Sequence, residues 1–130
     1  MGNAVYDKLA ERIGAAGYPT YIKVLENVVT PEEAELMLEL ADGATPAQTA
    51  QSRNIDEKSL AAKIEDLQTR RVLLKGPGGY VIPRSPRFFP HGPDNQKTRD
   101  LFTDFFRSGD YQKILVDGWY DSPIAAATAW

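Results

Sequence analysis

A lysine beside a glycine-rich turn is the feature of this sequence that most suggests a binding site. It lies in RRVLLKGPGGYVIPR, residues 70–84, where Lys75 directly precedes the four residues GPGG at 76–79. Such a loop can bind phosphate when it leads into a helix, because the backbone amides at the helix N-terminus then point at the anion. Here the loop leads into the strand-like run 80–82 and then into Pro83. Neither phosphate-loop spacing is present, so the pattern predicts the turn of a β-hairpin.

The sequence offers no residues in a pattern suited to catalysis or metal binding. The one histidine, His91, lies between Pro90 and Gly92 without acidic or cysteine partners at ligand spacing, so we expect an exposed loop residue. Ser59 and Ser85 have no histidine placed to act as their base. The absence of cysteine excludes disulfides, thiol catalysis and cysteine-ligated clusters within these residues. We therefore expect a chain that is not an enzyme by itself and contains no cofactor or metal.

Three helix starts follow one another along the first half of the chain. Residues 30–33, TPEE, and residues 45–48, TPAQ, each combine a threonine cap, a proline at the first helical position and the capping-box spacing. Asp56 can cap a third helix, whose apolar residues fall on one face: Leu60, Ile64 and Leu67. Two capped helices joined by a few residues predict a helix-turn-helix at about residues 45–70.

The predicted hairpin follows that motif directly and completes the expected fold. Residues 72–75 and 80–82 are apolar or β-branched on either side of GPGG, so we expect a wing at about residues 71–83. The apolar spacing also predicts helices at residues 4–13 and after Pro19. The expected fold class is mainly α with a small antiparallel β-hairpin. It is a winged helix-turn-helix domain at residues 1–86, with helical additions at both ends of the motif.

Residues 87–130 are expected to form a connector and a helical C-terminal extension, with helices at 94–107 and 110–117. The chain stops in an apolar, helix-competent run, so we expect that it is truncated from a longer protein. The aromatic residues of this part exceed what one helix face needs. Clusters of exposed apolar residues mark interfaces. We therefore expect a protein interface, with a further domain or a second copy, at Phe88, Phe89, Trp119, Tyr120 and Trp130.

Several segments resemble a known group of proteins. TPAQTAQSRNIDEKSLAAKIEDLQTRRVLLKGPGGYVIP resembles a winged helix-turn-helix unit. KLAERIG, TPEEAELMLEL and FTDFF are similar to the N-terminal region of bacterial and archaeal proteins that carry a winged helix ahead of a 4Fe-4S ferredoxin domain. The resemblance covers roughly residues 4–116. It implies a non-catalytic interaction module that positions or regulates an iron–sulfur redox partner region, with the cluster domain beyond Trp130 or on another chain.

A DNA-binding transcriptional regulator is the alternative. Residues 53–87 carry eight basic and four acidic residues, a net charge of +4, in a chain of net charge −3. In winged-helix regulators the second helix of the motif enters the major groove. The groove contacts would then be Lys58, Ser59 and Ala62, and the backbone contacts Lys63, Arg70, Arg71, Lys75 and the wing-tip Gly78.

Two acidic residues oppose this alternative. Glu65 and Asp66 fall on the outer face of the same predicted helix, where they would meet the phosphates. Because neutralised phosphates supply most non-specific affinity, acids at that face offset much of what the basic residues provide. The charges can equally form a solvated face of a module that binds protein.

The remaining expectations concern partners and location. We expect a protein partner or a following domain, with double-stranded DNA as the alternative partner and a homodimer as a further candidate. No apolar run approaches the length of a membrane span, and the start has no secretory signal. We therefore expect a cytoplasmic protein with no membrane partner.

Overall fold

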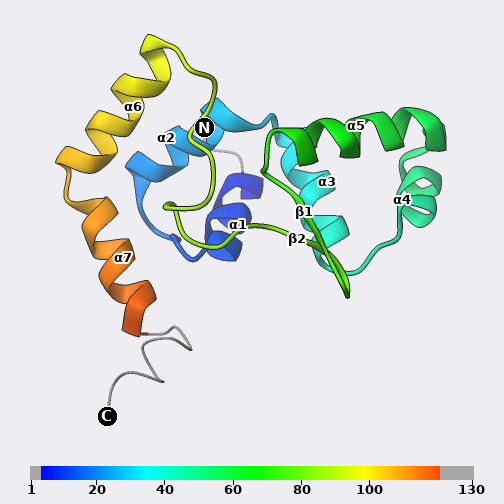
Figure 1. The fold of residues 1–130 in the computed structure, drawn as a ribbon, viewed down its shortest axis with the longest axis horizontal. Coiled ribbons are helices and arrows are strands. Elements are labelled where there is room, and N and C mark those ends of the chain that lie inside the picture. The colour runs from blue at the N-terminus through cyan, green and yellow to red at the C-terminus, as the bar shows by residue number, and fades with distance from the viewer. Residues whose placement is uncertain (1–3, 121–130) are drawn as a thin grey trace.

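The computed structural model describes residues 4–120, and their side chains as far as Val116. The described part is mainly helical with one small antiparallel sheet, which confirms the expected class at that level. Its elements, shown in Figure 1, are α1 (Ala4–Ile13), α2 (Pro19–Val28), α3 (Pro31–Ala41), α4 (Pro46–Arg53), α5 (Glu57–Thr69), β1 (Leu74–Gly76), β2 (Gly79–Val81), α6 (Gln96–Arg107) and α7 (Asp110–Tyr120).

The predicted caps start the three helices of the first half. The Thr30 hydroxyl accepts from the Glu33 amide while the Glu33 carboxylate accepts from the Thr30 amide, and Thr45 and Gln48 repeat this exchange. Asp56 accepts from the Ser59 amide at the start of α5. Each exchange satisfies amides that the first helical turn leaves without partners.

A tight left-handed turn joins α4 to α5. Asn54 has φ +54° and ψ +47°, a conformation that asparagine tolerates better than most residues. The Ile55 amide then donates to the Ala50 carbonyl oxygen at 3.0 Å. This turn packs α5 back against α4.

The hairpin is shorter than the predicted strands. Leu74 pairs with Val81 and Gly76 with Gly79, which has φ +131° in the turn. Val72 and Leu73 lie in the core instead of in the strand. The reason is the exit from α5: Arg71 has φ +64°, and the Val72 amide donates to the Leu67 carbonyl oxygen.

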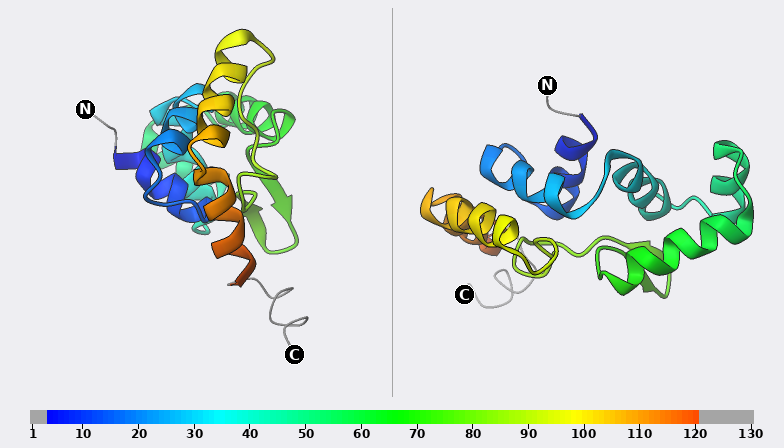
Figure 2. Two further views of the ribbon diagram at one scale, coloured as in Figure 1. Left: turned by 90° about the vertical axis from the view of Figure 1, so that its left-hand side faces the viewer. Right: turned by 90° about the horizontal axis from the view of Figure 1, so that it is seen from above.

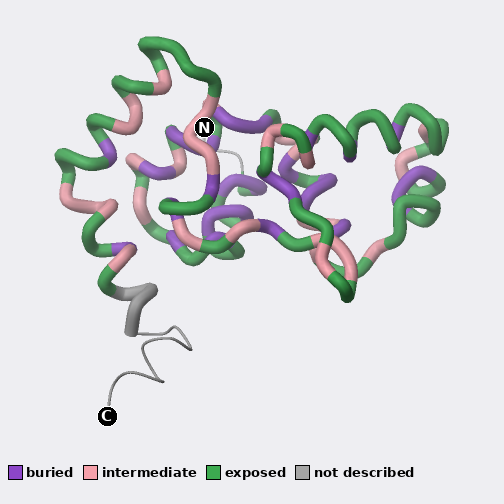
Figure 3. The backbone as a smooth tube through the Cα atoms, viewed as in Figure 1, coloured by how far each residue is buried: buried purple, intermediate pink, exposed green. Residues whose placement is uncertain are grey.

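The helices form two groups on either side of α3. α1 packs against α2 and α3, while α3 also packs against α4 and β2 (Figures 1 and 2). On the other side α6 lies along α2, and α7 continues from α6. Figure 3 shows buried residues through α1, α2 and α3, whereas α4 and α5 are mostly exposed.

The segment after the hairpin belongs to the same core. Ser85 has φ +82° and its amide donates to the Ile13 carbonyl oxygen at 2.7 Å. Phe89, Phe105 and Ile114 join the buried cluster that α1 to α5 form, so the core is continuous across the boundary predicted at residue 86. α6 starts two residues later than predicted because Asn95 is its cap. α7 extends past the predicted end at residue 117.

None of the helices in the described part is long and apolar enough to cross a membrane.

Candidate interaction surface

The outer face of α5 presents the residues that the helical pattern placed there. Leu60, Ile64 and Leu67 are buried against the rest of the fold. The opposite side of the helix is exposed at Lys58, Ser59, Ala62, Lys63, Glu65, Asp66 and Thr69. The candidate groove contacts Lys58, Ser59 and Ala62 are therefore accessible to a partner.

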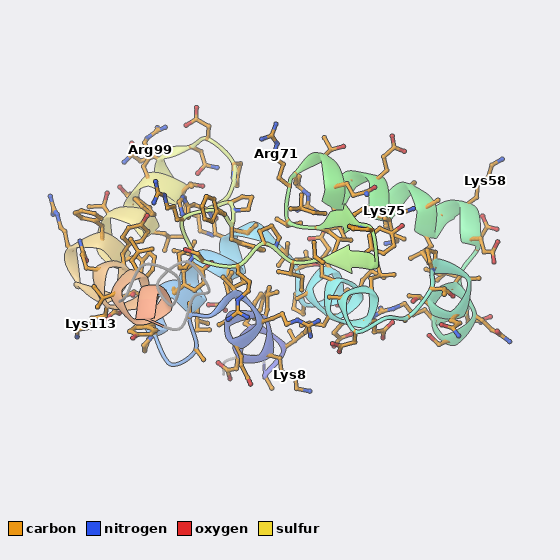
Figure 4. The ribbon with its side chains drawn as sticks, turned by 60° about the horizontal axis from the view of Figure 1, so that its bottom comes forward. Lys8, Lys58, Arg71, Lys75, Arg99 and Lys113 are labelled. Carbon is orange, nitrogen blue, oxygen red and sulfur yellow. The ribbon has the colours of Figure 1, made fainter. Side chains whose placement is uncertain are left out.

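Four basic residues of this region are exposed. Lys58 and Arg71 lie at opposite ends of α5, and Lys75 lies on the hairpin (Figure 4). Lys63 is exposed between them on α5. Within residues 4–116 no ion pair shorter than 4.0 Å involves any of these four. Together they form a basic set that spans the helix and the hairpin.

Arg70 differs from the other candidate phosphate contacts. Its guanidinium forms ion pairs with Glu33 and with Asp66, the latter at 2.9 Å, and Nη1 donates to the Val28 carbonyl oxygen at 3.0 Å. These contacts tie the end of α5 to α2 and α3. Arg70 is thus a structural cation, and we leave it out of the surface available to a partner.

Two acids, Glu33 and Asp66, share the guanidinium of Arg70. Burial alone would raise the pKa of Glu33, but hydrogen bonds from the Thr30 amide and Arg70, with the charge of Arg70, lower it. Asp66 shares Arg70 with Glu33, and Glu65 remains exposed without an ion pair in the described part. The outer face of α5 therefore keeps a negative contribution among its lysines.

An exposed apolar pair lies on the hairpin. Leu74 and Val81 are cross-strand partners, 43 % and 48 % exposed. The next pair is Lys75 and Tyr80, with the ammonium of Lys75 5.7 Å from the centre of the ring. Because Leu74 and Val81 lie directly opposite each other, their side chains share one face of the hairpin. Successive residues of a strand point to opposite faces, so Lys75 and Tyr80 lie on the other face. Gly78 at the tip is exposed.

The exposure of this apolar pair was not predicted from the sequence. Residues 72–75 are apolar at three successive positions, Val72, Leu73 and Leu74. In a strand with one buried face, only every second residue needs to be apolar. The lack of alternation was therefore the signal that one of these residues would be left outside the core.

The aromatic residues predicted to form an interface differ in their exposure. Phe88 is 69 % exposed, with the Arg87 guanidinium 5.7 Å from its ring centre. Phe89 is only 1 % exposed, so its prediction as an interface residue is wrong: it fills the core beneath the connector. The backbones of Trp119 and Tyr120 lie in α7, but their side chains and all of Trp130 lie outside what the structure describes.

Part of the aromatic excess forms an internal cluster. Phe102, Phe105 and Tyr111 contact one another with ring centres 5.5–6.2 Å apart, and Tyr21 of α2 lies 5.0 Å from Phe105. The ring of Phe106 is tilted against that of Tyr111, with ring centres 5.9 Å apart, and stays half-exposed. These rings attach α6 and α7 to α2.

His91 also joins this cluster, and its prediction as an exposed loop residue is wrong. The ring is half-buried, 4.3 Å from the centre of Phe102. Its Nε2 donates to the Pro86 carbonyl oxygen at 3.0 Å, since a carbonyl can only accept. Burial lowers the pKa of His91, against the effect of that hydrogen bond. Among residues 4–116 no group of acidic or histidine side chains could hold a metal ion.

The sequence matches no protein-family model, and no curated protein or solved structure is significantly similar to it.

Proposed function

We propose that residues 31–82 form a winged-helix unit and that the chain is a non-catalytic interaction module. The support is the order of capped helix, left-handed turn, second helix and antiparallel hairpin in α4, α5, β1 and β2. α3 supplies the third helix, which packs against α4 and β2. The module binds a protein through the outer face of α5 and the hairpin.

The observation that carries this proposal is the exposed pair Leu74–Val81. Covering two apolar side chains that are about half exposed gains roughly 1 kcal/mol each. A protein surface can provide that cover, whereas phosphates cannot. Glu65 and Asp66 on the adjacent helix also suit a partner with mixed charge better than a polyanion.

The partner that we propose is an iron–sulfur redox region, following the resemblance of the sequence to winged-helix ferredoxin-type proteins. The cluster and its ligands would belong to the partner, because this chain has no cysteine. The chain would position or regulate that region without taking part in electron transfer.

Calorimetric titration of the full chain with a purified bacterial 2[4Fe-4S] ferredoxin tests this proposal. We expect saturable binding that weakens about thirtyfold in the double variant Leu74→Ser, Val81→Ser, since roughly 2 kcal/mol of apolar burial is removed. Val116→Ser is the matched control, because Val116 is 54 % exposed on α7, outside the proposed surface. Absence of binding up to millimolar ferredoxin would contradict the iron–sulfur partner.

A DNA-binding regulator is the second candidate function, and the four exposed basic residues favour it. Lys58, Lys63, Arg71 and Lys75 span α5 and the hairpin without ion pairs in the described part. Fluorescence anisotropy with random-sequence duplex DNA at about 50 mM and then 200 mM salt tests it, since phosphate contacts make affinity fall steeply with salt. Binding that falls in this way would replace the protein-docking proposal.

A further inference from the structure

A groove of about 700 Å³ lies between α3 and α5; the hairpin pair does not line it, but Ala62, Lys63 and Asp66 of the outer face of α5 do. α3 and its cap form one wall, α5 forms the other, and the end of α4 with its turn closes the groove. Its apolar lining consists of Leu36, Ile55, Leu60, Ala62 and Leu67. Its charged lining consists of Glu32, Glu33, Arg53, Lys63 and Asp66.

Local structure explains why this space remains open. The left-handed turn at Asn54 packs α5 against α4, while α3 packs against α4 and β2. Ala62 is the smallest residue that lines the α5 wall, and it is exposed. Ile55, in the turn between α4 and α5, also lines the groove and is only half-buried.

Some charged residues around the groove have ion-pair partners in the described part and others do not. Glu33 and Asp66 share the single cation Arg70, which leaves that group with one excess negative charge. Glu32 is exposed and has no ion pair within the described part. Arg53 is held by Glu39 at 3.1 Å, so Lys63 is the one lining cation without an ion pair there.

The charges of Glu32 and Glu33 also act on Tyr6 of α1. The pKa of Tyr6 is raised first by burial and then by the charges of Glu26, Glu32 and Glu33. The hydroxyl of Tyr6 donates to the Val29 carbonyl oxygen at 2.8 Å, just before the cap of α3. The α3 side of the groove thus combines apolar lining with one carboxylate, Glu32, that has no ion pair in the described part.

We propose that this groove is a docking site for a short amphipathic segment of a partner protein, with apolar side chains facing Ile55 and Ala62 and an adjacent lysine or arginine facing Glu32 and Asp66. The volume is that of a pocket for a drug-sized molecule, roughly 300–1,000 Å³, so it accepts a few side chains and not a folded surface. Apolar anchors laid into a groove beside a helix are a common mode of peptide recognition. The inference rests on the proposed function only in taking the partner to be a protein.

Peptide selection with the full chain tests the proposal. A random twelve-residue phage library is selected on the immobilised protein, and the enriched peptides are synthesised, labelled and titrated by fluorescence anisotropy. We expect enriched peptides to combine apolar residues with lysine or arginine. Peptides without basic residues, or no enrichment over an unrelated protein, would overturn the proposal.

Two tryptophan substitutions then locate the binding. Ala62→Trp fills the groove and should weaken peptide binding at least tenfold, whereas Ala61→Trp is the matched control and should change it less than twofold. Both alanines are exposed on α5, but only Ala62 lines the groove. Glu32→Lys should weaken the binding of the basic peptides several-fold. Equal binding by both tryptophan variants would overturn the proposal.

The variant Leu74→Ser, Val81→Ser separates this inference from the proposed function. It leaves the groove lining intact, so the selected peptides should bind it as they bind the unchanged chain. Loss of peptide binding in this variant would place the site on the hairpin and overturn the groove. Loss of ferredoxin binding alone would leave the groove supported.

Discussion

At Gly92 a single missing side chain lets the connector approach α2. The residue has φ +126°, and a Cβ there would lie 2.3 Å from Nδ2 of Asn27. That amide donates to the His91 carbonyl oxygen at 3.2 Å and to the Thr98 hydroxyl at 2.8 Å. Asn27 therefore holds the connector and the start of α6 on α2, and the contact depends on glycine at this position.

Gly92→Ala should accordingly destabilise the fold. We expect the free energy of unfolding to fall by about 2 kcal/mol, because the alanine is strained at positive φ and displaces Asn27. Urea denaturation followed by circular dichroism measures the change. The control Gly78→Ala, with no neighbour within 4 Å, should stay within about 0.5 kcal/mol. Similar losses in both variants would contradict the role of the close approach.

His91 makes stability depend on pH at the same place. Its pKa is lowered from 6.5 by burial, so the unfolded chain binds more protons than the folded chain between the two pKa values. The contribution of His91 is present above about pH 6.5 and is lost as the pH falls toward the folded pKa. We expect the unchanged chain to lose more free energy of unfolding between pH 7.5 and 5 than His91→Gln, which cannot titrate. Equal losses in urea denaturation would refute this.

At the scale of elements, Arg70 fastens α5 to two other helices. Its guanidinium bridges Glu33 and Asp66 and donates to the Val28 carbonyl oxygen. Arg70→Met should lower the free energy of unfolding by about 1 kcal/mol, a value discounted because a third of the side chain is exposed. Lys63→Met, on the same helix and without an ion pair in the described part, is the control and should have little effect. An equal effect of both in thermal denaturation would contradict the bridge.

The positions of the helices could be predicted from the sequence better than the contacts by which the helices pack together. Thr30, Thr45 and Asp56 act on amides within three residues, so local pattern was enough to locate the starts of α3, α4 and α5. The burial of Phe89 and the engagement of Arg70 depend on contacts far along the chain, which no local pattern contains. His91 was misjudged for the same reason, since its partner Phe102 lies on another element.

The same limit applies to the candidate interaction surface. The exposed face of α5 follows from helical periodicity, and Lys58, Ala62 and Glu65 lie where the pattern placed them. The exposed pair Leu74–Val81 depends on where the chain leaves α5, which the left-handed Arg71 determines. The groove depends on the spacing of α3 and α5, and sequence periodicity carries no information on that distance.

At the scale of the whole molecule, one core joins the helical group of α6 and α7 to the rest. Phe105 is fully buried and contacts Tyr21 of α2, so Phe105→Ala should cost about 3–5 kcal/mol through the cavity that it leaves. Because the core is continuous, both halves should unfold together. Far-ultraviolet circular dichroism and the near-ultraviolet signal of the aromatic side chains should show the same lowered midpoint. Two separate midpoints would contradict a single cooperative unit.

The central claim is that the outer face of α5 and the hairpin is a protein-docking surface. Nuclear magnetic resonance titration of the isotope-labelled chain, with the ferredoxin and with duplex DNA in parallel samples, tests it most directly. We predict that ferredoxin shifts the resonances of Leu74, Val81 and Glu65 in a saturable manner, while DNA at 150 mM salt leaves them unchanged. Shifts at Lys58, Arg71 and Lys75 with DNA, and none with ferredoxin, would contradict the account.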